Sequence, residues 1–320
     1  MREIKLTDIE GVKIGHEQDR DGATGCTVIL CEEGAVAGVD VRGGAPGTRE
    51  TDLLDPMNLI EKIHAVLLSG GSAFGLDAAA GIMQFLEEKK IGFDVGVTRV
   101  PIVTGAVLFD LMIGDYGIRP DKAMGYKACQ NAYDQAYSEG TIGAGTGATI
   151  GKYLGMEYAM KGGIGIYCMQ VGSLQIGAVV AVNCMGDVID PKTGKIIAGI
   201  LNEDKSGLGN TEEMMIHNYR EQKNLFHGNT TIGAVITNAK LTKAQANKIA
   251  SIAHNGYART IRPAHTMVDG DTVFVMATGR EEADVNVVGI LAVKAVEEAI
   301  IRGIQKADDL HNIPAISNMK

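Results

Sequence analysis

Glycine is the residue that most constrains how this chain can fold. There are 42 glycines among the 320 residues, or about 13% (42/320), whereas soluble proteins average about 7%, and they follow no three-residue collagen period. A residue without a side chain serves tight turns and places where two stretches of backbone approach closely. The sequence therefore predicts a layered fold in which many loops meet around a site.

The overall composition narrows the class of protein. Hydrophobic residues make up 45% of the chain and charged residues 22%, which is typical of a soluble globular protein with a substantial core. A formal net charge of −9 argues against binding to nucleic acid, which normally needs a basic face. No run approaches the roughly eighteen apolar residues of a membrane helix, and the polar start at 1–5 lacks a signal peptide's apolar core. We expect a cytoplasmic protein with no nucleic-acid or membrane partner.

Cysteine and histidine give no sign of a metal or a cofactor. The five cysteines are scattered, with no C-x-x-C pair, so we expect them to be reduced, buried, small apolar side chains. The seven histidines contain no H-E-x-x-H pattern, and their spacing predicts no metal site. The cysteines are Cys26, Cys31, Cys129, Cys168 and Cys184.

Apolar periodicity predicts strands and helices in mixed order. The clearest helix start is Thr242, which forms a capping-box pattern with Gln245, and Asp55-Pro56 is a second start signal. Strands are expected at 24–30, 35–41, 65–68, 164–171, 175–183, 231–237 and 271–278, the first two joined as a hairpin through the turn at 32–34. Helices are expected at 55–64, 74–90, 122–138, 242–255 and 286–306, and a polar surface excursion at 202–228. Because regular βαβ alternation is missing, we predict an α/β arrangement with helices outside packed sheets.

Two familiar motifs fail on spacing. The segment from Gly145 to Lys152 ends like a phosphate-binding loop, but Thr146 replaces the first glycine and Tyr153 replaces the magnesium-binding hydroxyl. The segment at 70–75 misses the G-x-S-x-G nucleophile elbow, because the second residue after its serine is phenylalanine. Neither nucleotide binding nor a serine elbow is predicted.

A third segment places the Thr230 hydroxyl where a polar stretch enters a predicted strand. The segment is Gly228-Asn229-Thr230-Thr231, followed by an apolar run to Ala239. Taken alone, this pattern is also typical of an ordinary strand start. The residues by themselves therefore leave Thr230 open between a structural and a catalytic role.

A resemblance assigns this segment a role. Five motifs resemble, in order, those of the L-aminopeptidase/D-esterase family, self-processing hydrolases that include β-peptidyl aminopeptidases and a pantetheine-cleaving member. The match runs from about residue 5 to residue 305. The motifs are Asp40-Val-Arg-Gly-Gly-Ala-Pro-Gly-Thr-Arg-Glu50, Leu68-Ser-Gly-Gly-Ser-Ala-Phe-Gly-Leu-Asp-Ala78, Lys161-Gly-Gly-Ile-Gly165, Asn229 to Ala239, and Asp269-Gly-Asp-Thr272.

The resemblance implies a fold and a maturation step. The fold is a four-layer αββα sandwich, shared with the ornithine acetyltransferases, formed as a single domain over residues 1–320. Self-cleavage between Asn229 and Thr230 would give an α fragment of 229 residues and a β fragment of the remaining 91 (320 − 229). Threonine at this position resembles the pantetheine-cleaving member more than the serine aminopeptidases.

Self-cleavage would supply the catalytic base. A hydroxyl is a poor nucleophile at neutral pH, and a free α-amino group, with a pKa of about 7.7 to 8.0, can accept its proton. Before cleavage, the Thr230 hydroxyl would attack the Asn229 carbonyl in an N→O acyl shift, which requires the fold to hold that peptide in a near-attack geometry.

The resemblance assigns further site residues. Asn183, at the end of a predicted strand, would donate a hydrogen bond to the oxyanion; from the residues alone it equally ends a strand before a turn. Asp271 keeps the acid of the family's Ser-Gly-acid segment, while Asp269 departs from its serine. A carboxylate near the new ammonium would raise that group's pKa, although a solvated Asp-Gly-Asp turn fits the pattern too.

The remaining assignments concern substrate binding. Lys152 or Tyr153 falls near a position where relatives carry a tyrosine that points into the site, and the glycine run leaves the register open between them. Ser72 would offer backbone N–H groups to an anion or cap a helix. His265 lies close to Asp269 in sequence, but a lone histidine is more often structural.

The leading hypothesis is thus a self-processed N-terminal threonine aminopeptidase or amidase that acts on amide and ester bonds of small amino-terminal substrates through an acyl-enzyme. The first alternative is an acyltransferase of the ornithine acetyltransferase type, and the second is a processing-dead binding or assembly subunit. The resemblance also implies a homotetramer, and no cofactor is expected.

Overall fold

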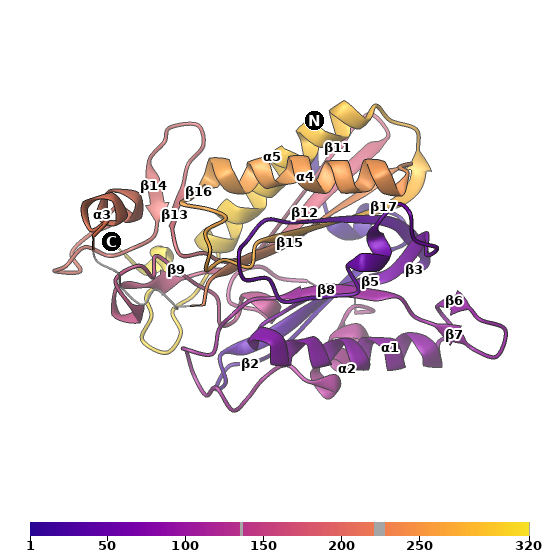
Figure 1. The fold of residues 1–320 in the computed structure, drawn as a ribbon, viewed down its shortest axis with the longest axis horizontal. Helices are drawn as coiled ribbons and strands as arrows, with labels where there is room; N and C mark the ends of the chain where they lie inside the picture. The colour runs from indigo at the N-terminus through magenta and orange to yellow at the C-terminus, as the bar shows by residue number, and fades with distance from the viewer. Residues whose placement is uncertain (135–136, 221–227, 320) are drawn as a thin grey trace.

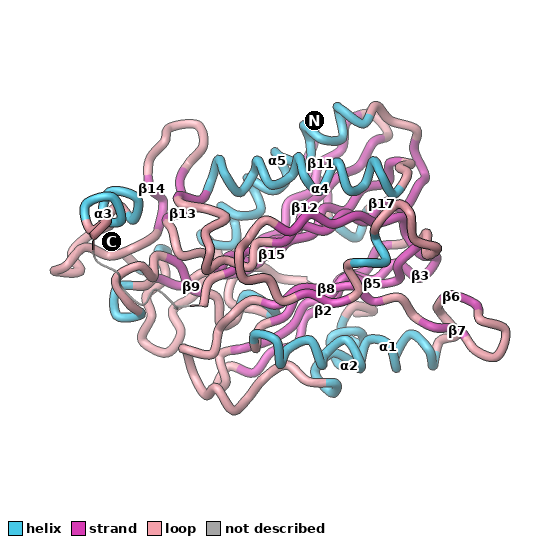
Figure 2. The backbone as a smooth tube through the Cα atoms, viewed as in Figure 1, coloured by secondary structure: helices cyan, strands magenta, loops and turns pink. Residues whose placement is uncertain are grey.

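Two β-sheets lie between two pairs of helices in this protein (Figure 1). The computed structural model describes residues 1–134, 137–220 and 228–319. Helices α4 (Lys243–Thr260) and α5 (Val285–Gln305) cover one side, and α1 (Ala78–Glu88) and α2 (Lys122–Asn131) cover the other. Figure 2 shows the strands gathered between these two helical layers. The predicted four-layer αββα sandwich is confirmed.

One long strand, β3 (Thr24–Val41), belongs to both sheets. Its first half pairs with β2 (Val12–Asp19) and β5 (Lys62–Ser69), and its second half pairs with β17 (Thr272–Glu281). The strand order is β1-β11-β12-β15-β17-β3-β5-β8-β4. The strands not yet named in this order are β1 (Arg2–Ile4), β11 (Gly163–Val171), β12 (Leu174–Asn183), β15 (Thr230–Ala239), β8 (Val103–Val107) and β4 (Thr48–Arg49).

The predicted hairpin at 24–41 is wrong. The chain continues straight through residues 32–34, and the pairing register with β5 shifts between Leu30 and Ala35. Gly34 has a φ of +75°, which a β-bulge accommodates as readily as a turn does. The segment bulges instead of reversing because β5 and β17 are both present as partners for its two halves.

Three apolar layers fill the spaces between the four layers of structure. Ile232 and Ala234 of β15 face the space between the sheets, where they meet Ile29 of β3. Val235, on the opposite face of β15, packs under α4 and α5, and Leu67 of β5 packs against α1 and α2. The period-two alternation of the strands thus places successive residues in different layers.

Four of the five predicted helices form, as α1, α2, α4 and α5. The Thr242–Gln245 capping box forms as predicted at the start of α4, and the side chain of Asp284 caps α5 by accepting from Asn286 N. The predicted helix at 122–138 ends at Asn131, and its residues 135–136 lie outside the described residues.

Two further predictions need correction. No helix forms at 55–64: the Asp55 carboxylate accepts from the Met57 N–H in a local turn, and β5 begins at Lys62. The polar excursion at 202–228 contains a short helix, α3 (Thr211–His217), capped by Asn210, while residues 221–227 lie outside the described residues.

The short strands are β6 (Phe93–Asp94), β7 (Arg99–Val100), β9 (Thr149–Ile150), β10 (Met160–Lys161), β13 (Asp187–Ile189), β14 (Ile196–Ala198) and β16 (Ile261–Arg262). All five cysteines are buried and free, as predicted. Across the described part of the chain, the helices are too short or too polar to cross a membrane.

Candidate active site

The site forms where two neighbouring strands end together. Thr230 is the first residue of β15 and Asn183 is the last residue of β12, and the two are directly paired in the antiparallel register. Both residues are almost completely buried, Thr230 with 4% of its surface exposed and Asn183 with none. The sheet itself therefore brings together two residues that are 47 positions (230 − 183) apart in the sequence.

The hydroxyl of Thr230 lies between the carbonyl group of Asn229 and the backbone of Gly270, which lies just before β17. Its Oγ1 donates to the carbonyl oxygen of Asn229 and accepts from the N–H of Gly270 at 3.1 Å. A Cβ on Gly270 would lie 2.7 Å from this Oγ1 and 2.9 Å from the carbonyl oxygen of Ala45. Only glycine allows the backbone to approach the hydroxyl so closely.

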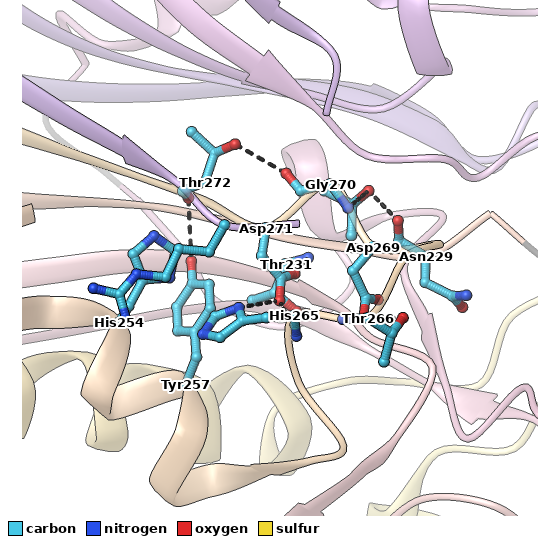
Figure 3. A network of polar contacts seen from close by, with 12 residues as sticks. Asn229, Thr231, His254, Tyr257, His265, Thr266, Asp269, Gly270, Asp271 and Thr272 are labelled. Atoms are coloured by element: carbon cyan, nitrogen blue, oxygen red, sulfur yellow. Dashed lines mark hydrogen bonds and ion pairs between the residues drawn. The ribbon is translucent and has the colours of Figure 1, made fainter. Parts of the chain in front are cut away.

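Parallel pairing of β15 and β17 brings the Asp269-Gly270-Asp271 segment to the start of β15, and Figure 3 shows this segment beside Asn229 and Thr231. Asp271 accepts from the N–H of Thr231 at 2.8 Å through its Oδ1. Asp269 and Asp271 are 1% and 2% exposed, so the reading of this segment as a solvated turn is wrong. The loop after β3 covers the segment, since the N–H of Arg42 donates to the Asp271 carbonyl and that of Ala45 to the Asp269 carbonyl.

Asp269 is a buried acid. Its Oδ2 accepts from the backbone N–H and the hydroxyl of Thr266, at 2.8 and 2.6 Å, and its Oδ1 has no partner among the described residues. Burial, together with the charge of Asp271, raises the pKa of Asp269 to about 6. The carboxyl group can therefore exchange a proton near neutral pH.

Lys152 reaches the same place from the glycine-rich segment. Its Nζ donates to the backbone and side-chain oxygens of Asn183, at 3.0 and 2.9 Å, and to the carbonyl oxygen of Gly228 at 3.2 Å. Burial lowers the pKa of Lys152 to about 7, so a neutral amine is accessible at physiological pH. Of the two residues between which the sequence left the register open, the structure brings Lys152 into the site. Tyr153 is buried, and neither it nor Lys152 lines the cavity beside Thr230; Lys152 belongs to the site through its bonds to Asn183 and Gly228.

The amide of Asn183 has a defined orientation. Its Oδ1 accepts from Lys152 and from the N–H of Thr149 at 2.9 Å, which leaves Nδ2 to donate to the carbonyl oxygen of Phe109 at 2.9 Å. An asparagine Nδ2 carries two hydrogens, and this bond uses one of them. The other is a candidate donor to an oxyanion.

A cavity of about 130 Å³ opens beside Thr230 and Asn229. Ser72 lines it, and its own N–H donates to the Leu108 carbonyl at 3.0 Å. Gly71, not Ser72, occupies the cap position of the short helix, so the cap role is wrong, while substrate binding at Ser72 stays a prediction. The other lining residues are Ala45, Pro46, Gly47, Ala73, Val107, Leu108, Phe109, Gly228 and Val268.

The side chain of Asn229 is buried without partners. The residue is 2% exposed, and neither its Oδ1 nor its Nδ2 meets a hydrogen-bonding group among the described residues. Leaving a buried polar group unpaired costs about 1–3 kcal/mol.

Sequence reasoning missed three parts of this arrangement. Phe109 holds the Asn183 amide, Gly270 donates to the Thr230 hydroxyl, and His265 donates to Asp271 at 2.8 Å. Of these three, only Gly270 was indicated by the sequence pattern, because a glycine between two acids allows another stretch of backbone to approach closely. In the described part of the chain, no group of three or more His, Cys, Asp or Glu side chains is arranged to hold a metal ion.

Comparisons with known proteins identify the family of the chain. The model of peptidase family S58 matches residues 5–315. An uncharacterized aminopeptidase of Mycobacterium leprae is 42% identical over 98% of this chain and 93% of its own length. A 6-aminohexanoate-oligomer endohydrolase of Agromyces sp. is 30% identical over 94% of this chain and 86% of its own.

Solved structures share the fold. The L-aminopeptidase D-Ala-esterase/amidase of Ochrobactrum anthropi, described as a variant of the Ntn hydrolase fold, has a TM-score of 0.72 at 19% identity and covers 97% of this chain and 88% of its own. A β-aminopeptidase of Burkholderia sp. has a TM-score of 0.68 at 20% identity, covering 97% of this chain and 88% of its own. The fold predicted from the resemblance is confirmed by these likenesses.

Proposed function

The chain belongs to peptidase family S58 and is a hydrolase of peptide bonds, and from that premise we propose that it is an N-terminal threonine hydrolase that activates itself by cutting before Thr230. The observation that carries the proposal is the position of the Thr230 hydroxyl. It lies buried against the Asn229 carbonyl, with the Gly270 N–H on its oxygen and a cavity beside it. We propose that residues 1–229 and 230–320 are two fragments of one domain.

Self-cleavage would proceed by an acyl shift. The Thr230 oxygen attacks the carbonyl carbon of Asn229, the C–N bond breaks, and the hydroxyl proton ends on the released amine of Thr230. Water then hydrolyses the resulting ester and frees the carboxylate of Asn229. Lys152, Asp269 and Asp271 are the titratable side chains around this bond and would relay the proton, because the first two titrate near neutral pH.

Turnover would use the same atoms on a substrate. The free amine of Thr230 accepts the proton as its hydroxyl attacks the substrate carbonyl, giving an acyl-enzyme that water hydrolyses. The second Nδ2 hydrogen of Asn183 would stabilise the charge that develops on the carbonyl oxygen. Loss of one such donor typically costs about 2.7–4 kcal/mol of transition-state stabilisation.

The substrate we propose is a small amide with a short, largely apolar acyl group. A cavity of about 130 Å³ with alanine, proline, valine, leucine and phenylalanine in its walls has room for few heavy atoms. The relatives named an uncharacterized aminopeptidase and a 6-aminohexanoate-oligomer endohydrolase support an amide bond as the bond that is cut. From the family resemblance we propose a homotetramer, whose size gel filtration would measure.

Intact mass after incubation tests the proposal. The 33.8 kDa chain should give fragments of about 24 and 10 kDa, in proportion to their lengths, with Thr230 as the second N-terminus. Thr230→Ala should abolish both cutting and hydrolysis of a small peptide amide, because it removes the nucleophile.

The matched control is Thr231→Ala, since this neighbouring hydroxyl is also buried but has no partner among the described residues; this variant should still cut. Wild-type protein that stays at 33.8 kDa would favour the processing-dead subunit. Faster consumption of an acetyl donor with an added amine acceptor than with water alone would favour the acyltransferase.

A further inference from the structure

We propose that His265 is a positioning residue for Asp271: its imidazole N–H fixes the direction of the Asp271 carboxylate and, through it, the start of β15 at Thr230. This inference rests on the proposed function, because it assigns a role within the same site. It concerns a residue that sequence reasoning expected to be merely structural.

The contacts of Asp271 form a chain that ends at the nucleophile. Its Oδ2 accepts from the backbone N–H of His265 at 3.0 Å and from Nδ1 of the same residue at 2.8 Å. Its Oδ1 accepts from the N–H of Thr231 at 2.8 Å. Both oxygens are therefore directed, one toward His265 and one toward the residue that follows Thr230. With Asp271 2% exposed, water cannot readily replace a lost donor.

The imidazole of His265 is itself held by helix α4. Its ring meets the edge of His254, with centroids 4.8 Å apart at 75°, and stacks on Tyr257 at 6.0 Å and 29°. Figure 3 shows this cluster beside Asp271. Packing on two sides leaves the ring little freedom to turn its Nδ1 away from the carboxylate.

The charges around the ring favour a proton on Nδ1. Nε2 of His265 is buried without a partner among the described residues, whereas Nδ1 faces a carboxylate, which accepts and cannot donate. Burial lowers the pKa of His254 to about 4, so this neighbour is neutral at pH 7. Tyr257 on α4 is uncharged as well, since burial raises its pKa far above the usual range. Asp40 on β3 meets His254 through its carbonyl oxygen.

The backbone of His265 provides a way to isolate the side-chain donor. Its φ is +58°, in the left-handed region that glycine and asparagine tolerate best. Asparagine also places an N–H donor on its Nδ2, at the same position along the side chain as histidine Nδ1. His265→Asn and His265→Gly thus both fit the backbone and both lose the ring, but only the asparagine variant keeps a donor.

The experiment compares the self-cleavage rates of these two variants with that of the wild type. His265→Gly should slow cleavage about tenfold or more, because the Asp271 carboxylate loses a buried donor. His265→Asn, which keeps a donor, should restore the rate to within about threefold of wild type. His265→Phe keeps a ring that can pack on Tyr257 but has no donor, so it should behave like His265→Gly. It takes the place of His265→Gly in the experiment if the glycine variant does not fold.

A second arm needs no catalysis. In the uncleavable Thr230→Ala chain, hydrogen exchange at the Thr231 amide should accelerate with His265→Gly and remain slow with His265→Asn. If this exchange pattern is found but the wild-type chain is never cut, the proposed function is overturned and the positioning role remains. Wild-type behaviour of the glycine and phenylalanine variants, or an asparagine variant as impaired as the glycine variant, would overturn the positioning role.

Discussion

At the scale of single residues, burial decides the chemistry. Lys152 and Asp269 would both be charged at pH 7 in water, yet burial moves their pKa values toward 7 from opposite sides. Two groups with pKa values near neutrality can accept and return protons without a metal or a strong base. The folded state holds these groups at a cost in stability, and that cost is measurable through its pH dependence.

Asp269→Asn should stabilise the uncleaved Thr230→Ala chain at neutral pH. Because the pKa of Asp269 rises from 3.8 to about 6 on folding, the folded chain binds more protons than the unfolded chain between those pH values. The carboxyl group thus contributes stability below about pH 4 that is lost as the pH rises through 6. Asparagine cannot ionise, so at pH 7 the variant should gain about 3 kcal/mol, measured by urea denaturation.

The control for this measurement is the exposed Asp21, whose change to asparagine should alter stability by less than about 0.5 kcal/mol. A loss of stability at pH 7 in Asp269→Asn would show instead that the ionised carboxylate stabilises the fold.

At the scale of elements, glycine sets how closely α5 approaches the sheet. A Cβ on Gly165 of β11 would lie 1.9 Å from the carbonyl oxygen of Ala299 and 2.4 Å from the nitrogen of Gly303, both on α5. These are backbone atoms that no rotamer change can move. The high glycine content of the chain is here a requirement of layer-on-layer packing.

Gly165→Ala should therefore lower the free energy of unfolding by about 3 kcal/mol, because α5 must shift away from β11. Thermal and urea denaturation would measure it. Gly172→Ala, in the turn after β11, is the comparison: nothing lies within 4 Å of its Cβ, and only its φ of +61° costs about 1 kcal/mol. If Gly165→Ala and Gly172→Ala lowered the free energy of unfolding equally, α5 would be able to move away from β11 at little cost.

At the scale of the whole molecule, the proposed cut falls inside the sheet. Strands β15 and β17, on the C-terminal side of Thr230, lie between β12 and β3 from the N-terminal side. β12 and β15 are paired from Ile176–Thr237 to Asn183–Thr230. The two fragments would therefore share one core, and neither could leave without exposing the apolar layers on both faces of the sheet.

The cleaved fragments should thus elute together in gel filtration under native conditions and separate only in denaturant. Thermal unfolding of the cleaved protein should remain a single transition. Separation of the small fragment in native buffer would contradict this arrangement of strands.

Local patterns in the sequence determined the elements whose stability is local. The strands at 164–171 and 175–183 are confirmed by β11 and β12, and the capping box of α4 forms between neighbours in the chain. The strand start at Thr230 and the acids Asp269 and Asp271 were also marked by local composition and by the family resemblance, whose fold is confirmed. Their functional roles remain predictions.

Only the tertiary structure decided what depends on partners distant in sequence. Residues 32–34 form a bulge and not a turn because β5 and β17 both pair with β3. The Asp-Gly-Asp segment is buried and not solvated because the loop after β3 bonds to it. Lys152 enters the site because β12 and β15 end side by side beneath it. A sequence encodes the hydrophobic alternation of each strand, but burial, and with it the pKa of an acid or an amine, is set by which distant segments close over it.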